Sequence, residues 1–471
     1  MKRYIYILIA IVIIQALARC KKLINIGLPN NTITTEAVFQ TDNQAKSAMA
    51  GLYYNMVNDA RWFSGTQLTF LTSLSADELI PFALTDQHTF AFYSNELLSS
   101  SIYVESLWST AYSAIYTCNA VIENLELSTS VSDALKRRLI GEAKFIRAFC
   151  YFNLVNLFGS VPLVQTTNWH NTNLLERSLS GAIYKSIIKD LVEAQNGLSD
   201  EFSVSGGERI LPTRWAAKSL LCKVYVYNKD WSAAIGEADA ILNNNSFFQL
   251  EELDKIFSPQ SKEAIWQLKQ NPLQNNLFAS PLGVHFIPAQ FNSNIPPSYY
   301  LTESLMSAFS LADQRLAKWV RPTEYSPTGT VYFLPYKYKV GRGQISGQYS
   351  EYHTVMRLAD VYLLRAEARL NNENVPGALE DLNKVRLRSG LQPIDNTTSY
   401  LQLKDSLMHE RQLELFCEWG NRWFDLKRWN KADDVLSKKS SSVWQIADTL
   451  YPVPISEIQK NPNITQNAGY N

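Results

Sequence analysis

The sequence predicts a predominantly α-helical protein, in which paired helices form the scaffold and a loop-rich region and a few short strands are added to it. Three observations predict this class. Apolar residues recur with helical spacing in four segments of the N-terminal half. Two later stretches, 213–242 and 358–385, have the form helix, tight turn, helix. The stretch 244–350 is instead irregular, because Pro, Asn and aromatic residues interrupt it.

Composition excludes several classes of protein. The chain has 471 residues and 46% of them are hydrophobic, which excludes a disordered or collagen-like protein. Lys and Arg number 44, as do Asp and Glu, so the formal net charge is zero. Without a basic excess we expect no nucleic-acid partner. The length allows either several domains or one large helical assembly.

The N-terminus has the pattern of an exported lipoprotein. Lys2 and Arg3 precede an apolar run that is too short to span a bilayer core, which favours a signal peptide over residues 1–19. A membrane anchor helix is the alternative. The run from Leu17 to Cys20 resembles a lipobox, although Arg19 replaces the usual small residue. We therefore predict lipidation of Cys20, followed by a polar tether over 20–43 and a single domain over 44–471.

Four helices are expected before residue 200, and each is indicated by an apolar stripe. Gly159 and Pro162 end the third helix. The stripes begin at Ala45, Leu107, Leu139 and Ile183 and end at Met56, Leu125, Leu157 and Leu198.

Two helix pairs follow. Thr213 is the expected N-cap of the first pair, and its turn lies at Asn228 to Trp231. The turn of the second pair contains Pro376 and Gly377. Each pair has small residues where its two helices cross closely, as tetratricopeptide units do. The full repeat consensus is not met, so we interpret these pairs as degenerate repeats.

The region 244–350 is expected to be an irregular insert laid over the scaffold, where binding groups are common. One short strand is predicted at 263–268. After a loop at 391–400, a long helix is predicted from Leu401 to Glu418.

No pattern indicates a cofactor or a metal. Cys118, Cys150, Cys222 and Cys417 show no CxxC spacing, and the sequence leaves open whether they form disulfides. Zincin, nucleophile-elbow, Walker and dinucleotide motifs are absent from the sequence. Asp77 and Glu78 are the one pair weighed for glycoside hydrolysis, but adjacent residues seldom face one substrate across the required gap.

A dense charged cluster lies at 410–429. Glu410, Glu414 and Glu418 are expected to share one helix face, with Arg422 and Arg428 as their partners. We interpret the cluster as a partly buried ion-pair network that docks a helix end. A binding role is the alternative.

Three segments resemble the SusD/RagB family. Glu142 to Val164 is similar to its signature helix and turn, Glu410 to Trp429 is similar to its second signature, and Leu450 to Tyr470 is similar to its closing segment. The order of the segments and the lipobox-like start also fit, so the resemblance covers essentially the whole chain.

The resemblance implies four tetratricopeptide-like units and no catalysis. It also implies an outer-membrane lipoprotein that binds a nutrient, usually an oligosaccharide, and acts as the lid of a SusC-like TonB-dependent transporter. Lys21 and Lys22 follow Cys20 where surface-exported lipoproteins often carry acidic residues. The leaflet therefore stays open, with the surface-exposed one expected.

The expected ligand is a glycan or a peptide, held by aromatic platforms and polar partners. A membrane-anchored glycoside hydrolase, or a transporter subunit with no ligand site of its own, is the alternative. Core packing is the competing interpretation of each candidate ligand residue, namely Trp62, Asp77, Phe92, Tyr93, Asn95, Tyr299, Tyr300, Arg315 and Trp319.

Overall fold

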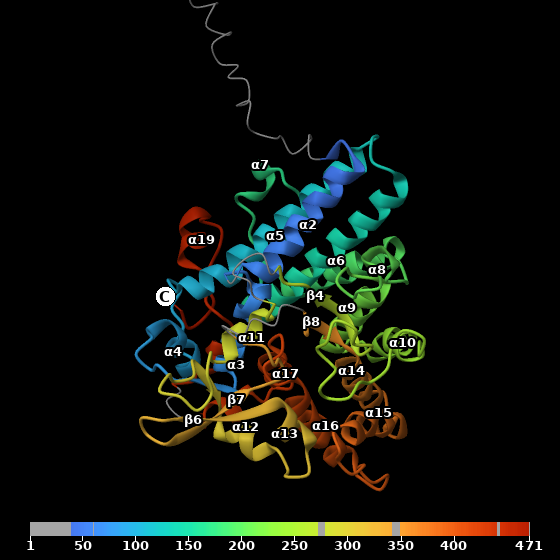
Figure 1. Ribbon diagram of the computed structural model, residues 1–471. Coiled ribbons are helices and arrows are strands. Elements are labelled where there is room, and N and C mark those ends of the chain that lie inside the picture. Colours follow the sequence, from blue (N-terminus) through green and yellow to red (C-terminus); the bar gives the residue numbers. More distant parts are fainter. Residues whose placement is uncertain (1–38, 60, 272–277, 342–348, 440–442, 471) are drawn as a thin grey trace, which may run out of the picture.

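The computed structural model describes residues 39–59, 61–271, 278–341, 349–439 and 443–470 (Figure 1). Most of the regular structure is helical and the strands are short, which confirms the predicted class. The predicted signal peptide, Cys20 and all but the last residues of the predicted tether lie outside the described residues. Within the described ranges, no helix is long and apolar enough to cross a membrane.

Four long helices occupy the positions predicted by the apolar stripes. They are α2 (Asp42–Asn58), α5 (Ile102–Leu127), α6 (Asp133–Phe158) and α8 (Ser180–Gly197). Helix α6 packs against both α5 and α8. It ends at Gly159, as predicted, and the φ of 72° at this residue suits a glycine.

A buried arginine joins the three helices α5, α6 and α8. Arg147 on α6 donates to both carboxylate oxygens of Asp190 on α8, at 2.8 and 2.7 Å. Its third nitrogen donates to Asn119 Oδ1 on α5 at 2.7 Å. Because its charge is paired and its donors are used, this arginine is accommodated between the helices.

The two predicted helix pairs are present and stack on one another. The first comprises α9 (Arg214–Tyr227) and α10 (Trp231–Leu242), and the second comprises α14 (Leu358–Asn371) and α15 (Val375–Arg388). Helix α10 packs on α14. Thr213 is the N-cap residue, as predicted, but its side chain accepts no hydrogen bond from the helix.

The region 244–350 is more regular than predicted. Strand β4 (Ala264–Leu268) confirms the predicted strand and pairs with β8 (His353–Arg357). Strands β6 (Val320–Tyr325) and β7 (Thr330–Pro335) form an unpredicted hairpin. The proline in β6 masks this strand in the sequence, although a proline is tolerated on an edge strand. The short helices of this region are α11 (Pro281–Phe286), α12 (Glu303–Ala308) and α13 (Gln314–Trp319).

The described strands pair in twos, all antiparallel. Besides the pairs above, β1 (Leu79–Pro81) pairs with β5 (Tyr299–Leu301), and β2 (Val161–Pro162) pairs with β3 (Arg177–Ser178). The remaining helices of the N-terminal half are a π-helical turn (Phe63–Gln67), α3 (Leu68–Ser75), α4 (Gln87–Ser94), α7 (Trp169–Thr172) and a 3₁₀ turn (Ser203–Ser205).

The C-terminal part consists of short helices after one long one. They are α16 (Tyr400–Leu415), α17 (Asn421–Arg428), α18 (Ala432–Leu436), a 3₁₀ turn (Ile446–Thr449) and α19 (Ile455–Lys460). Helix α16 ends before the predicted Glu418, because Phe416 has an extended ψ of 141° and Cys417 is left-handed with a φ of 52°. Figure 1 shows the segment around α19 beside α5.

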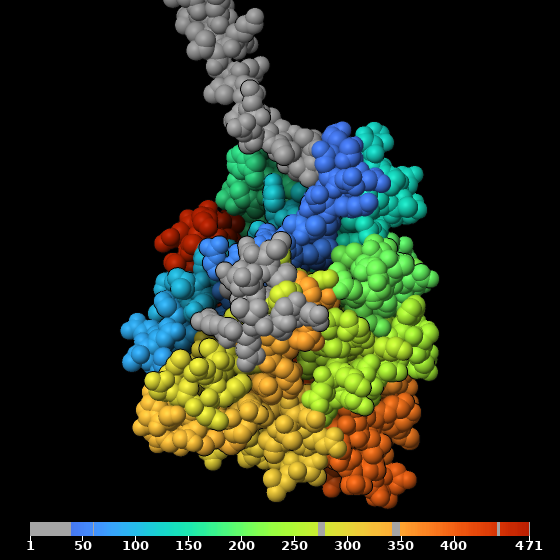
Figure 2. Space-filling view, in the orientation of Figure 1, coloured from blue at the N-terminus to red at the C-terminus, as the bar shows by residue number. Residues whose placement is uncertain are grey.

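The core is continuous from the N-terminal helices to the C-terminal segment. Trp108, Trp266, Trp319 and Trp423 are fully buried in it. Tyr451 lies with its hydroxyl 2.7 Å from Ser75 Oγ, which ties the last part of the chain to α3. The four cysteines of the described residues are buried and free, so none of them forms a disulfide. In Figure 2 the N-terminal helices lie at the top and the region of α12, α13 and the hairpin at the bottom.

Candidate functional site

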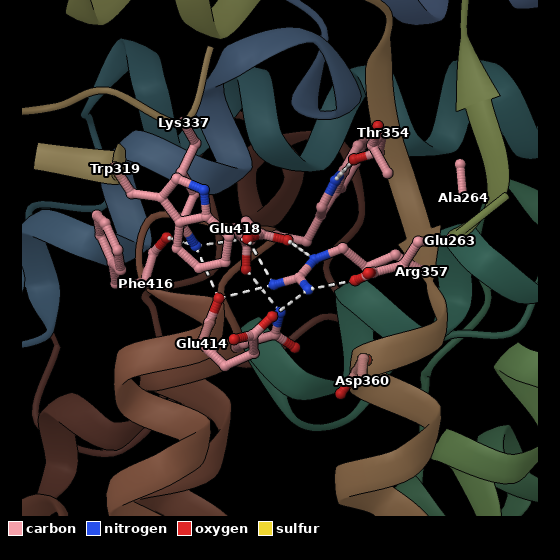
Figure 3. A network of polar contacts seen from close by, with 12 residues as sticks. Glu263, Ala264, Trp319, Lys337, Thr354, Arg357, Asp360, Glu414, Phe416 and Glu418 are labelled. Atoms are coloured by element: carbon pink, nitrogen blue, oxygen red, sulfur yellow. Dashed lines mark hydrogen bonds and ion pairs between the residues drawn. The ribbon is translucent and has the colours of Figure 1, made fainter. Parts of the chain in front are cut away.

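The charged cluster at 410–429 is a buried network around the end of α16, which confirms its structural interpretation (Figure 3). Glu414 projects from α16, whereas Glu418 lies in the turn beyond, so the three glutamates do not share one helix face as predicted. Arg357 lies between the carboxylates of Glu263, Glu414 and Glu418. Lys337 donates to Glu418 at 2.5 Å and to the carbonyl oxygens of Glu414 and Phe416 at 2.8 Å each.

The cations that face Glu410 and Glu414 come from outside the cluster. Arg315 Nη1 lies 2.7 Å from Glu410 and 2.9 Å from Glu414. Arg386 and Arg388 on α15 complete the pairs with Glu410 and Glu414 respectively. Sequence spacing could not indicate these partners, because they are more than twenty positions away and approach only when α13 and α15 pack on α16.

The prediction that Arg422 and Arg428 neutralise the three glutamates is wrong. Arg422 binds both carboxylate oxygens of Asp77, at 2.7 and 2.8 Å. Arg428 pairs instead with Glu367 and Asp425. The cluster therefore docks α17 onto α3 and α14.

The network holds Glu414 ionised despite burial, whereas burial raises the pKa of Glu410 and Glu263. Burial alone would raise the pKa of Glu414, but Arg388, Arg357 and Arg315 hold that pKa well below its ordinary value. Glu78 lies outside these pairs, and burial raises its pKa to about 7. Ser73 donates to Glu78 at 2.7 Å. Neither carboxylate of the Asp77–Glu78 pair is thus presented to a substrate.

Most of the predicted ligand residues are buried, so they do not form an accessible site. Arg315 is held in the network, and the Trp319 indole donates to Leu253 O at 3.1 Å. Asn95 donates to Ser75 O at 3.1 Å. A fully packed side chain offers no surface to a ligand, so packing or ion pairing is the role that the structure gives to Trp62, Asp77, Phe92, Tyr93, Asn95, Tyr299, Arg315 and Trp319.

Tyr300 is the exception, because its ring is half-buried and belongs to an aromatic group on the surface. We call Phe82, Tyr300, Tyr325 and Tyr332, all half-buried, the Tyr300 cluster. The Phe82 ring lies 5.4 Å from that of Tyr325 and 5.6 Å from that of Tyr332, both edge-on. The rings of Tyr300 and Tyr332 are 4.7 Å apart at 61°.

Strand pairing gathers these rings. In the sheet of β1 and β5, Tyr300 lies opposite Ile80, and the Phe82 amide donates to Ser298 O at 3.0 Å, which brings Phe82 beside β5. Side chains alternate along β5, so Tyr299 packs on Phe70 in the core while Tyr300 meets the hairpin.

The hairpin contributes the other two rings from one of its faces. Thr323 lies opposite Tyr332, and Tyr325 lies opposite Thr330. Asn292 fixes this hairpin to the preceding loop, since its amide donates to Thr323 Oγ1 at 3.0 Å and its Oδ1 accepts from the Glu324 amide at 2.9 Å. The rings are therefore held before any ligand arrives.

The Tyr300 cluster has the chemistry of a carbohydrate platform. Tilted ring faces cover the apolar side of a sugar, and tyrosine hydroxyls pair with its hydroxyl groups. The segments that carry the rings, 79–86, 293–301 and the hairpin 320–335, contain the charged residues Asp86, Arg321 and Glu324. Sequence spacing gives no signal for Phe82, Tyr325 and Tyr332, because only the unpredicted hairpin and the β1–β5 pair bring them to Tyr300.

A separate concavity of about 920 Å³ lies between α2 and α6. Aliphatic side chains form much of its lining, including Met49, Leu135 and Leu139, and none of the four rings contributes. Its Glu142 accepts a hydrogen bond from Tyr53 at 2.8 Å and is therefore already engaged. The lining also includes Tyr53, Tyr54 and Tyr349. In the part of the chain that is described, no group of His, Cys, Asp or Glu could hold a metal ion.

Comparison with known proteins agrees with this fold. SusD-like protein P25 of Formosa agariphila is 24% identical over 94% of this chain and 94% of its own length. A SusD superfamily protein from Bacteroides vulgatus superposes with a TM-score of 0.78 at 21% identity, covering 91% of this chain and 99% of that one. A laminarin-binding SusD-like protein gives a TM-score of 0.73 at 23% identity, covering 92% and 100% respectively.

Two family models match separate parts of the sequence. The one described as the SusD family matches residues 317–470. The one described as starch-binding, associating with the outer membrane, matches residues 35–226. Together they cover most of the chain, including the segments that carry the resemblance. The chain belongs to the SusD family.

Proposed function

We propose that this protein captures an oligosaccharide at the outer membrane, without cleaving it, through the Tyr300 cluster. The observation that carries the proposal is the gathering of four half-buried rings from three distant segments onto one surface. Rings that served packing alone would stabilise the fold more if they were fully buried. The partial exposure of these four rings therefore favours a ligand-facing role.

The comparisons support a glycan as the ligand class. One matching family is described as starch-binding, and one structural neighbour is described as laminarin-binding. Both names refer to neutral glucans.

A non-catalytic role is supported by the state of the paired carboxylates. Asp77 is paired with Arg422, and Glu78 is buried beside Ser73. A glycosidase needs two carboxyl groups that face the same glycosidic bond. Incubation with polysaccharides, followed by a reducing-end assay, is expected to show no turnover.

Anchoring and delivery complete the proposal. Signal cleavage before Cys20 would leave a lipidated tether, a single domain would follow from about residue 44, and the protein would face outwards on the outer membrane. There it would act as the lid of a SusC-like TonB-dependent transporter. Detergent extraction with a tag on the C-terminus should recover a barrel partner, and recovery of the protein alone would contradict the transporter part.

Calorimetry against starch and laminarin oligosaccharides tests the ligand site. The Tyr300→Ala and Tyr332→Ala variants should each weaken binding by about tenfold or more, because each removes a stacking surface. Tyr116→Ala is the matched control, since this tyrosine is exposed on α5 and outside the cluster. Unchanged affinity in both cluster variants would refute the site, and preferential binding of peptides would refute the ligand class.

A further inference from the structure

Trp169 is unusual among the tryptophans of this protein. All eleven lie in the described residues, and Trp169 alone exposes more than a third of its surface, at 62%. Burying such a ring would stabilise the fold. A single exposed apolar side chain does not by itself indicate a binding site. The way in which the fold holds Trp169 is therefore the evidence to consider.

The Trp169 ring is presented on a firmly fixed segment. Its centroid lies 3.8 Å from that of the His170 ring, at 33°, so the imidazole packs against one face of the indole and leaves the other face open. The preceding Thr167 donates its amide to the carboxylate of Glu123 on α5 at 3.1 Å. Tyr151 on α6 donates to Val164 O at 2.9 Å. The surface is therefore largely preorganised, which reduces the entropy lost on binding.

Two neutral amide residues follow the two rings in the sequence. Asn171 and Asn173 are exposed, and their side chains make no hydrogen bond to any described residue. The segment 166–174 contains no Lys, Arg, Asp or Glu. Free amides beside an aromatic surface match the hydroxyl rim and the apolar face of a sugar. An anionic lipid surface would instead require nearby cations.

We propose that Trp169 and His170, with Asn171 and Asn173, form a second glycan-contact site. Figure 1 places α7, which carries Trp169, near the start of α2, whereas the hairpin with the Tyr300 cluster lies at the opposite end of the molecule. A short oligosaccharide occupies one site only. A polysaccharide reaches both, and two linked contacts raise the overall affinity without any new interaction at either.

Acrylamide quenching of tryptophan fluorescence tests this site, because Trp169 is the accessible tryptophan. Trp169→Phe should lose the readily quenched component. Saturation of the wild-type chain with laminarin or amylopectin should protect that component. Protection should persist in the Tyr300→Ala/Tyr332→Ala double variant, which separates this proposal from that of the Tyr300 cluster.

Affinity measurements provide the second readout. Trp169→Ala should weaken polysaccharide binding by about tenfold or more, through lost avidity, and leave trisaccharide binding unchanged. Leu127→Ala, at another exposed apolar position, is the control and should alter neither. Unprotected Trp169 with every polysaccharide tested would overturn the proposal. Protection by phosphatidylglycerol vesicles alone would also overturn it, in favour of a lipid contact.

Discussion

Arg357 binds both carboxylate oxygens of Glu418, with Nε 2.8 Å from Oε2 and Nη2 2.9 Å from Oε1. Through the same guanidinium, β8 is joined to Glu263 beside β4 and to Glu414 on α16. One side chain thus connects the helix-pair scaffold to the turn in front of α17. Substitution of Arg357 therefore tests whether the buried network stabilises the fold.

Arg357→Met should lower the free energy of unfolding by about 3–5 kcal/mol, because it leaves buried carboxylates without their cation. Urea unfolding followed by circular dichroism measures the change. Lys384→Met removes an exposed pair with Glu380 on α15 and should cost less than about 1 kcal/mol. Equal losses in the two variants would show that the network does not stabilise the fold.

Phe92→Ala should separate packing from binding. Phe92 is fully buried, so its truncation should cost about 3–5 kcal/mol of stability through the cavity left behind. The glycan affinity of the folded protein should stay at the wild-type value. Tyr332→Ala is expected to show the reverse pattern, with a small loss of stability and a large loss of affinity. A folded Phe92→Ala protein that binds no glycan would restore Phe92 as a ligand residue.

The acidic residues beside the Tyr300 cluster should weaken the binding of anionic glycans. Asp86 and Glu324 are exposed on the ring-bearing segments, so sulfated laminarin should bind more weakly than laminarin. Glu324→Lys should raise the affinity for the sulfated form at low salt, with a smaller effect on the neutral one. Lys404→Glu on α16 provides a remote charge change as the control. Tighter binding of sulfated laminarin by the wild-type protein would contradict this assignment.

Stability should rise with pH through Lys427. Burial lowers the pKa of Lys427 to about 7, and its ammonium group donates to Asn156 O. An unfolded lysine has a pKa near about 10.4, so between these values the unfolded chain binds a proton that the folded chain lacks. The free energy of unfolding contributed by this group therefore increases from about pH 7 to about pH 10.

Lys427→Met should reduce the slope of the unfolding free energy against pH, as measured by urea unfolding at about pH 7.5 and about pH 9.5, and Lys439, whose pKa burial also lowers to about 7, should retain part of it. Lys404→Met, at an exposed position, should retain the wild-type slope. A Lys427→Met protein with the wild-type slope would assign the pH dependence to other groups.

Local sequence patterns predicted the helices well, because each stripe needs only neighbouring turns. The positions of α2, α5, α6 and α8 follow from such stripes, and Gly159 ends α6 as expected, although α5 and α6 begin at Ile102 and Asp133, before the first residue of each stripe. The end of α16 was placed too late, since the pattern of carboxylates continues to Glu418 while the backbone turns at Phe416.

The candidate site depended on contacts that a local pattern does not contain. Tyr300 was predicted, but Phe82 joins it from 218 positions earlier in the chain and Tyr332 from 32 positions later. The sequence could not distinguish whether the other aromatic candidates pack in the core or contact a ligand. Phe92 and Trp319 lie in the core.

The three ring-bearing segments contribute no side chain to the ion pairs behind α16, since Arg315, Lys337 and Arg357 all lie outside them. Substitutions in these segments can therefore change the proposed ligand preference without disturbing the buried ion pairs. Relatives that bind different polysaccharides are then expected to differ first at these positions.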